Sequence, residues 1–351
     1  MTIVADSYTF VVGVDTHART HSYVILEAAT GRKIAAEFFP TSPAGIRRAI
    51  DWIARRAEGP VLIAAEGTGS YGAGLTRALV QASYEIVEAR PPKRAQRAGK
   101  GKSDLIDAHA AASSVLPKDT TELIRPRAGK LRSALRVLLT ARRAMDAQRT
   151  ADRNALTALV RIIDLGIDAR KPLKDAQIAQ MASWRARPSD DIEQATARAE
   201  ATRLARNTIE STKRLEDNMA ALRRHVHELA PQLMDTPGIG PVTAAIFLTA
   251  YSHRGRVRSE AAFAALAGAA PIPASSGNTN RYRLSRHGDR QLNSALEIVA
   301  RTRLAFDPDT RAYHQRRLAE GKTPREIRRL LKRYIARQVY RKLNARITIS
   351  A

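Results

Sequence analysis

The 351-residue sequence contains no cysteine. That absence excludes disulfide bonds, a thiolate nucleophile and cysteine-ligated zinc sites. The sequence also has no apolar run long enough to cross a bilayer and shows no secretory signal. These absences predict a protein that works in the reducing cytoplasm and has no membrane partner.

Acidic residues are scarce relative to basic ones. The chain has 59 Lys and Arg against 34 Asp and Glu, which gives a net charge of +25 and a pI near 11. An excess of this size predicts a polyanionic partner, above all nucleic acid, with a basic membrane-surface protein as the weaker alternative. The length allows two or three domains with sizeable cores.

The first part of the chain alternates between predicted strands and helices. Residues 10–39 indicate three strands, followed by a helix opened by Ser42 and Pro43, a buried strand over 61–66, a second helix, a strand over 84–89 and a third helix after Ser103. This order predicts an α/β domain with a mixed sheet, and it resembles the ribonuclease H-like fold.

Four carboxylates stand at informative places in that order. Asp104 and Asp107 follow a basic loop with Lys100 and Lys102, and an i, i+3 spacing puts both on one helix face. Asp15 and Glu66 end two predicted strands, at positions where the ribonuclease H-like fold gathers acids. Such a set could hold Mg²⁺ beside a phosphodiester. The plain alternatives are favourable charges in a first helical turn and exposed strand ends. His17 and His109 lie close by in sequence, with a surface position as the default reading of each.

The rest of the chain reads as mainly helical. We expect a first domain over residues 8–160, a helical or coiled-coil arm over 161–228 and a mainly α domain over 229–346, with a plain helical linker as the alternative to the arm. The Gly-Ile-Gly motif within residues 236–244 is typical of a helix-hairpin-helix-like element, or of a simple turn between helices.

The last domain carries much of the positive charge and a serine loop. A capping box at Thr323 opens a basic helix that suits phosphate contacts better than base reading. Candidate nucleic-acid contacts in the whole chain are Lys100, Lys102, Arg281, Arg283, Arg286, Arg290, Arg329, Lys332 and Arg333. Ser276, in a Ser-Ser-Gly loop beside these arginines, is either a nucleophile or part of a flexible polar turn.

Two sets of motifs together resemble the insertion sequence 110 family of bacterial transposases. The first set is Asp15, Glu66 and the segment Lys-Ser-Asp-Leu-Ile-Asp at residues 102–107. The second set is Pro-Gly-Ile-Gly at 237–240, Ser-Gly at 276–277 and Leu-Ser-Arg-His-Gly-Asp-Arg-Gln-Leu at 284–292. The resemblance extends over nearly the whole chain. Many members have Arg where this chain has Asn293.

The resemblance implies a resolvase-like (DEDD) domain, with Mg²⁺ held by Asp15, Glu66, Asp104 and Asp107, and a transposase domain with Ser276 as nucleophile. Ser275 is the alternative nucleophile. The implied partners are donor DNA, target DNA and a structured guide (bridge) RNA, and the implied assembly is a homodimer or homotetramer acting at the bacterial nucleoid. The alternative function is a metal-dependent DNA junction resolvase or nuclease without a serine step. An actin-like ATPase and a non-catalytic nucleic-acid scaffold are further alternatives.

Overall fold

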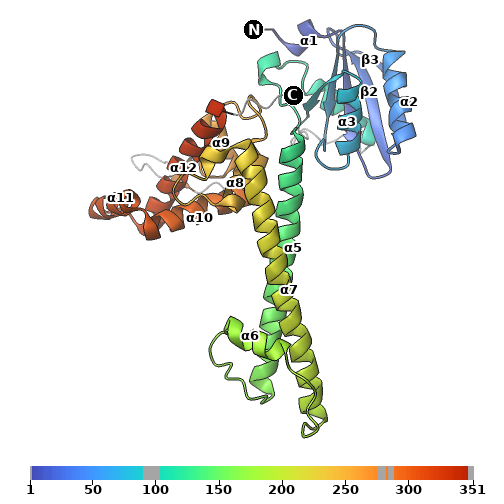
Figure 1. The fold of residues 1–351 in the computed structure, drawn as a ribbon. Coiled ribbons are helices and arrows are strands. Elements are labelled where there is room, and N and C mark those ends of the chain that lie inside the picture. Colours follow the sequence, from blue (N-terminus) through green and yellow to red (C-terminus); the bar gives the residue numbers. More distant parts are fainter. Residues whose placement is uncertain (1, 90–102, 275–281, 284–287, 347–351) are drawn as a thin grey trace. The chain divides into compact units, whose positions relative to one another are not determined.

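The computed structural model describes residues 2–89, 103–274, 282–283 and 288–346. By its internal contacts the chain divides into two compact units, Met1–Arg127 and Ala128–Ala351 (Figure 1). We call them the α/β unit and the helical unit, and each is described by itself.

The α/β unit is built on a five-stranded mixed sheet. Its strands are β1 (Phe10–Thr16), β2 (Thr20–Glu27), β3 (Lys33–Pro40), β4 (Val61–Ala65) and β5 (Glu85–Glu88), in the spatial order β3-β2-β1-β4-β5. The first three strands form an antiparallel meander, and β4 and β5 join β1 in parallel. The mixed α/β sheet predicted from the sequence is therefore confirmed.

Helices cover both faces of this sheet because its central strands are apolar on both sides. α2 (Pro43–Ala54) and α3 (Ala73–Gln81) pack on the face that carries Val12 and Val14, and α4 (Asp104–Ser113) packs on the face that carries Val11. Two short elements complete the unit, α1 (Val4–Ser7) and η2 (Thr120–Glu122). The Ser42 hydroxyl accepts the backbone N–H of Gly45 at 3.2 Å, so the predicted cap of α2 is present.

α4 lies unusually close to β1 at Gly13. A Cβ atom placed on Gly13 would stand 1.9 Å from the carbonyl oxygen of Ala108. Only a residue without a side chain allows this approach, because backbone cannot yield as the end of a flexible side chain can. The contact brings the first turn of α4 toward the end of β1. Ser103 occupies the N-cap position, as predicted, but its side chain makes no capping hydrogen bond.

The helical unit begins with two long antiparallel helices, α5 (Lys130–Ile162) and α7 (Ile192–Leu229), joined through the short α6 (Asp175–Ala182) (Figure 1). Side chains of each helix bond the backbone of the other: Asn218 donates to the Leu138 carbonyl and Arg142 to the Leu215 carbonyl, both at 3.0 Å. The sequence assigned the first of these helices to the α/β domain and ended that domain at residue 160. The structure groups all of α5 with the helical unit, because its apolar face is buried against α7.

The remaining helices contribute to the largest hydrophobic core among the described residues. They are η3 (Pro231–Leu233), α8 (Pro241–Tyr251), α9 (Glu260–Leu266), α10 (Arg290–Phe306), α11 (Pro308–Ala319) and α12 (Pro324–Arg346). Two short strands, β6 (Ile272–Pro273) and β7 (Tyr282–Arg283), pair between α9 and α10 in the chain. The Gly-Ile-Gly motif turns the chain into α8, with Gly238 at a positive φ of 77° and the Gly240 N–H donating to the Thr243 hydroxyl. Among the described residues, no helix combines the length and apolarity that a membrane crossing requires.

Candidate metal centre

Two of the predicted acids end neighbouring parallel strands. Asp15 lies one residue beyond the Val14–Ala65 pair of β1 and β4, and Glu66 lies one residue beyond it on the other strand. The backbone N–H of Glu66 donates to the carbonyl of Val14 at 3.0 Å, which holds the two strand ends together. Strand alternation places both acids on the face covered by α4, because side chains two residues apart share a face.

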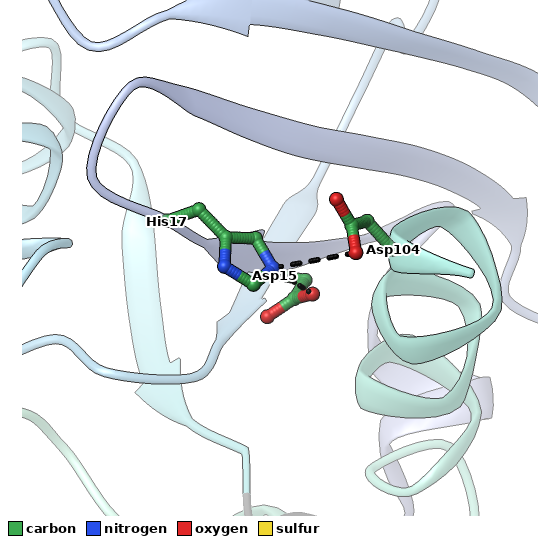
Figure 2. Close-up of side chains that lie close together, drawn as sticks. All are labelled: Asp15, His17 and Asp104. Atoms are coloured by element: carbon green, nitrogen blue, oxygen red, sulfur yellow. Dashed lines mark hydrogen bonds and ion pairs between the residues drawn. The ribbon is translucent and has the colours of Figure 1, made fainter. Parts of the chain in front are cut away.

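The other two predicted acids stand in the first turn of α4. Asp104 and Asp107 are both partly buried. His17 joins this helix to β1: its Nε2 lies 2.9 Å from Oδ2 of Asp15 and 3.5 Å from Oδ1 of Asp104 (Figure 2). Ligand atoms of Asp15, His17 and Asp104 lie within 4.8 Å of one another. Within the described residues, Glu66 and Asp107 are not members of this close cluster.

Asp15 is the most buried acid of the group, with 7% of its surface exposed. Burial raises the pKa of Asp15 because the ionised form loses its water. His17 acts in the opposite direction, and the charges of Asp107 and Asp104 raise the Asp15 pKa further. A cation at this place would offset the repulsion among these carboxylates.

The donor atoms therefore fit a divalent metal. Carboxylate oxygens are the ligands that Mg²⁺ and similar hard cations prefer. The imidazole of His17 lies between the carboxylates of Asp15 and Asp104, where a positive charge would be stabilised. The parts of the site come from β1 and α4, which are far apart in sequence and meet through the Gly13 contact.

His17 is the member of the cluster that sequence reasoning did not place there. The sequence gives His17 and His109 equal standing, since each follows a predicted acid by two residues. In the structure His109 pairs with the Ser113 hydroxyl at 3.2 Å on an exposed stretch of α4, whereas His17 contacts two acids. The sequence feature that distinguishes the two histidines is the predicted strand before His17. That strand determines the direction in which the chain continues past Asp15.

The predicted serine nucleophile and many predicted nucleic-acid contacts lie outside the described residues. These are Lys100, Lys102, Ser275, Ser276, Arg281 and Arg286, together with the side chain of Arg283. Of the others, Arg290 and Arg329 are exposed at the surface of the helical unit. Arg333 is partly buried, with Nη2 3.6 Å from Oε1 of Glu260.

Lys332 differs from the other predicted contacts because it is buried, with 8% of the residue exposed. Its Nζ donates to Oδ1 of Asn293 at 2.8 Å and lies 3.6 Å from Oε2 of Glu297. Nδ2 of Asn293 in turn donates to the carbonyl of Ala267 at 2.6 Å. This network gives Lys332 a structural role that the sequence did not reveal.

Comparison with known families gives matches in both units. Residues 12–164 match the family model of DEDD transposases of the IS110 group, and residues 230–315 match the model of the transposase IS116/IS110/IS902 family. The chain belongs to the IS110 family of transposases. Membership in this family, together with the acidic cluster, indicates a divalent-metal site.

Two curated relatives of this chain come from insertion elements. The chain is 36% identical over 115 residues to the IS110 uncharacterized 43.6 kDa protein of Streptomyces coelicolor, which covers 32% of the chain and 28% of that protein. It is 30% identical over 201 residues to the IS900 uncharacterized 42 kDa protein of Mycobacterium paratuberculosis, which covers 55% of the chain and 48% of that protein. The matched part thus spans less than half the length of each relative.

Proposed function

We propose that this chain is a DNA transposase that excises and inserts an insertion sequence, with a Mg²⁺ site formed by Asp15, Glu66, Asp104 and Asp107. The observation that carries the proposal is the meeting of Asp15 and Asp104 around His17 at the end of β1. Family membership and the net charge of +25 support DNA as the substrate. The strand order β3-β2-β1-β4-β5 supports a ribonuclease H-like, resolvase-type fold for the α/β unit.

In this proposal the carboxylates bind the cation and Ser276 carries out the bond-forming step. Bound Mg²⁺ would lower the pKa of a coordinated oxygen and stabilise charge on the reacting phosphate. The carboxylates of β1, β4 and α4 would hold the cation, and His17 would orient Asp15 through its 2.9 Å contact. In the strand cleavage step, Oγ of Ser276 forms a bond to phosphorus as the bond from phosphorus to the leaving sugar oxygen breaks. The serine proton is released and the leaving oxygen becomes a hydroxyl group.

We further propose that a guide RNA pairs with the donor and target DNA and that a homodimer or homotetramer carries out the reaction. The large positive charge supports more than one nucleic-acid partner. The Gly-Ile-Gly turn before α8 is proposed as a helix-hairpin-helix-like contact to a phosphate backbone.

The metal site is tested with Asp104→Asn. We expect Mg²⁺-dependent strand transfer to be lost, because an amide is a weaker ligand, while circular dichroism stays unchanged. The matched control is Asp146→Asn, which alters an exposed acid of α5 that pairs with Arg149 at 2.8 Å. Unimpaired strand transfer by Asp104→Asn would remove this residue from the metal site.

The serine step is tested with two neighbouring variants. Ser276→Ala should still bind DNA and RNA but form no covalent protein–DNA adduct on a denaturing gel, whereas Ser275→Ala should form the adduct normally. An adduct that survives in Ser276→Ala and disappears in Ser275→Ala would move the nucleophile by one residue.

A junction resolvase or nuclease without a serine step is the second candidate function. The observation in its favour is that the acidic cluster lies wholly within the α/β unit. It predicts that branched DNA is cut to free ends without attached protein, and that Ser276→Ala and Ser275→Ala both cut as well as the parent chain.

A further inference from the structure

One acidic residue gathers three arginines on the surface of the helical unit. Glu260, at the start of α9, lies 3.0 Å from Nε of Arg337, 3.6 Å from Nη2 of Arg333 and 3.6 Å from Nε of Arg341. The three arginines follow one another at intervals of four residues along α12, so they form one row with steps of about 6 Å along the helix axis.

The row keeps a surplus of positive charge that water can reach. One carboxylate faces three guanidinium groups, which leaves two positive charges uncompensated within the cluster. The exposed fraction of the side chain rises along the row, from 25% in Arg333 to 43% in Arg337 and 72% in Arg341. Nη1 of Arg333 is buried, so this arginine forms the inner end of the row. Glu260 restrains Arg337 and Arg341 without covering them, and their remaining N–H groups can donate to phosphate oxygens.

The same face of α12 carries exposed apolar side chains. Tyr334 is 66% exposed and Leu330 is 41% exposed. Tyr334 stands three positions before Arg337 and seven before Arg341, so its ring shares their side of the helix. An exposed aromatic ring among arginines can stack on an unpaired base while the guanidinium groups hold the strand's phosphates.

A second acid that contacts α12 behaves differently. Glu297 of α10 contacts Arg328 and the buried Lys332, which is already bonded to Asn293. That group joins α10 to α12 and leaves Lys332 no access to a ligand. The contrast separates a charge network that fastens two helices from one that remains open to a ligand.

We propose that Arg337, Arg341 and Tyr334 form a binding surface for an unpaired nucleic-acid strand, with Glu260 as the residue that aligns the arginines. The proposal rests on the proposed function only in taking nucleic acid as the partner. It concerns the helical unit and binding alone, so its test needs neither a metal nor strand cleavage.

The first test measures how affinity depends on salt. The full chain is titrated, without divalent metal, with fluorescent single-stranded DNA, single-stranded RNA and duplex DNA of one sequence. Each lost phosphate contact should reduce the slope of log K against log salt by about 0.7 on a single strand. We expect this reduction for Arg337→Gln and Arg341→Gln and not for Arg203→Gln, whose exposed side chain pairs with Glu200 on α7 at 2.8 Å. Equal slopes in all four proteins would overturn the proposal.

The second test isolates the aromatic ring. Tyr334→Ala should weaken binding of at least one single-stranded probe by about 10-fold and of the duplex by much less, while Tyr334→Phe should bind like the parent chain because it keeps the ring. Because the side chain is exposed, thermal unfolding should not change. An equal loss on all three probes, or a loss in Tyr334→Phe that matches Tyr334→Ala, would contradict stacking.

The third test separates a ligand surface from a structural staple between α9 and α12. Glu260→Gln keeps an oxygen that can accept from Nε of Arg337 but removes the negative charge that competes with phosphate. Binding at low salt should therefore be as tight as in the parent chain or tighter, opposite in direction to Arg337→Gln. A staple predicts that both variants lose stability and affinity together, and that result would refute the proposal. All three tests measure binding without divalent metal and without strand cleavage, so failure of the metal site and failure of this surface remain distinguishable.

Discussion

The two units place their charged groups by different means. In the α/β unit, acids from β1 and α4 meet at the C-terminal end of the central strand β1, and the most buried of them, Asp15, is 7% exposed. In the helical unit, arginines repeat every four residues on the exposed face of α12 and share a single acid. The first arrangement depends on tertiary packing, whereas the second depends on helix periodicity. Changes in packing should therefore damage the acidic site far more than the basic surface.

The largest effect is expected on strand transfer, when one acid of each unit is replaced. Asp15→Asn should reduce Mg²⁺-dependent strand transfer by at least about 100-fold, because a buried ligand is lost. Glu210→Gln removes an exposed acid of α7 that pairs with Arg214, and it should stay within about two-fold of the parent chain. Rates on a supercoiled donor plasmid measure both. Similar losses of strand transfer in the two variants would mean that the acids of the α/β unit have no special part in the reaction.

The next effect concerns the contact beneath the acidic site. Gly13→Ala should lower the free energy of unfolding of the α/β unit by about 3 kcal/mol, because the new methyl group meets the Ala108 carbonyl. Gly74→Ala is the control, since the nearest atom to its added methyl lies at 3.8 Å. Urea unfolding can be followed in a Trp184→Phe background, in which Trp52 of α2 is the sole tryptophan. A cost below that of Gly74→Ala would refute the tight contact.

A core change in the arm gives the reciprocal experiment. Leu222→Ala removes a fully buried side chain of α7 and should cost the helical unit about 2–3 kcal/mol. Ile209→Ala, at a site 44% exposed on the same helix, should change stability by less than about 0.5 kcal/mol. In a Trp52→Phe background Trp184 reports on the helical unit. The Trp184→Phe background, in which Trp52 reports on the α/β unit, is the comparison. If Leu222→Ala shifts the transition equally in both backgrounds, the units do not unfold separately.

The smallest expected effect is a pH dependence of the helical unit. A hydrogen bond from Arg198 lowers the pKa of Asp190 below its ordinary value of 3.8. The unfolded chain therefore takes up this proton first, so the stabilisation is complete above about pH 4 and is lost as the pH falls through the lowered folded value. Unfolding of the Trp184 reporter at pH 7 and pH 3 measures the loss. Asp190→Asn should reduce the difference between the two pH values, and an unchanged difference would exclude this pair as its source.

The sequence predicted local structure well where neighbouring residues determine it. The three first strands, the Ser42 cap of α2 and the capping box at Thr323 are all present, with the Glu326 N–H bonding the Thr323 hydroxyl at 3.3 Å. Asp15 and Glu66 lie at the ends of neighbouring strands, where the resemblance to the ribonuclease H-like fold leads one to expect them.

Partners that are distant in the chain could not be predicted in this way. The role of His17 depends on where α4 packs, the burial of Lys332 depends on α10, and the alignment of the arginine row depends on Glu260. The extent of α5 shows the same limit: its periodicity predicts a helix but does not say whether its apolar face meets the sheet or α7.

The Asn293 network also constrains how the sequence can change over time. The side-chain oxygen of Asn293 accepts a hydrogen bond from the Lys332 ammonium, and the side-chain N–H of Asn293 donates to the carbonyl of Ala267. An arginine at position 293 has no acceptor and would set a second positive charge against a buried lysine. Replacement at one position therefore requires replacement at the other, so residues 293 and 332 should vary as a pair among relatives of this chain.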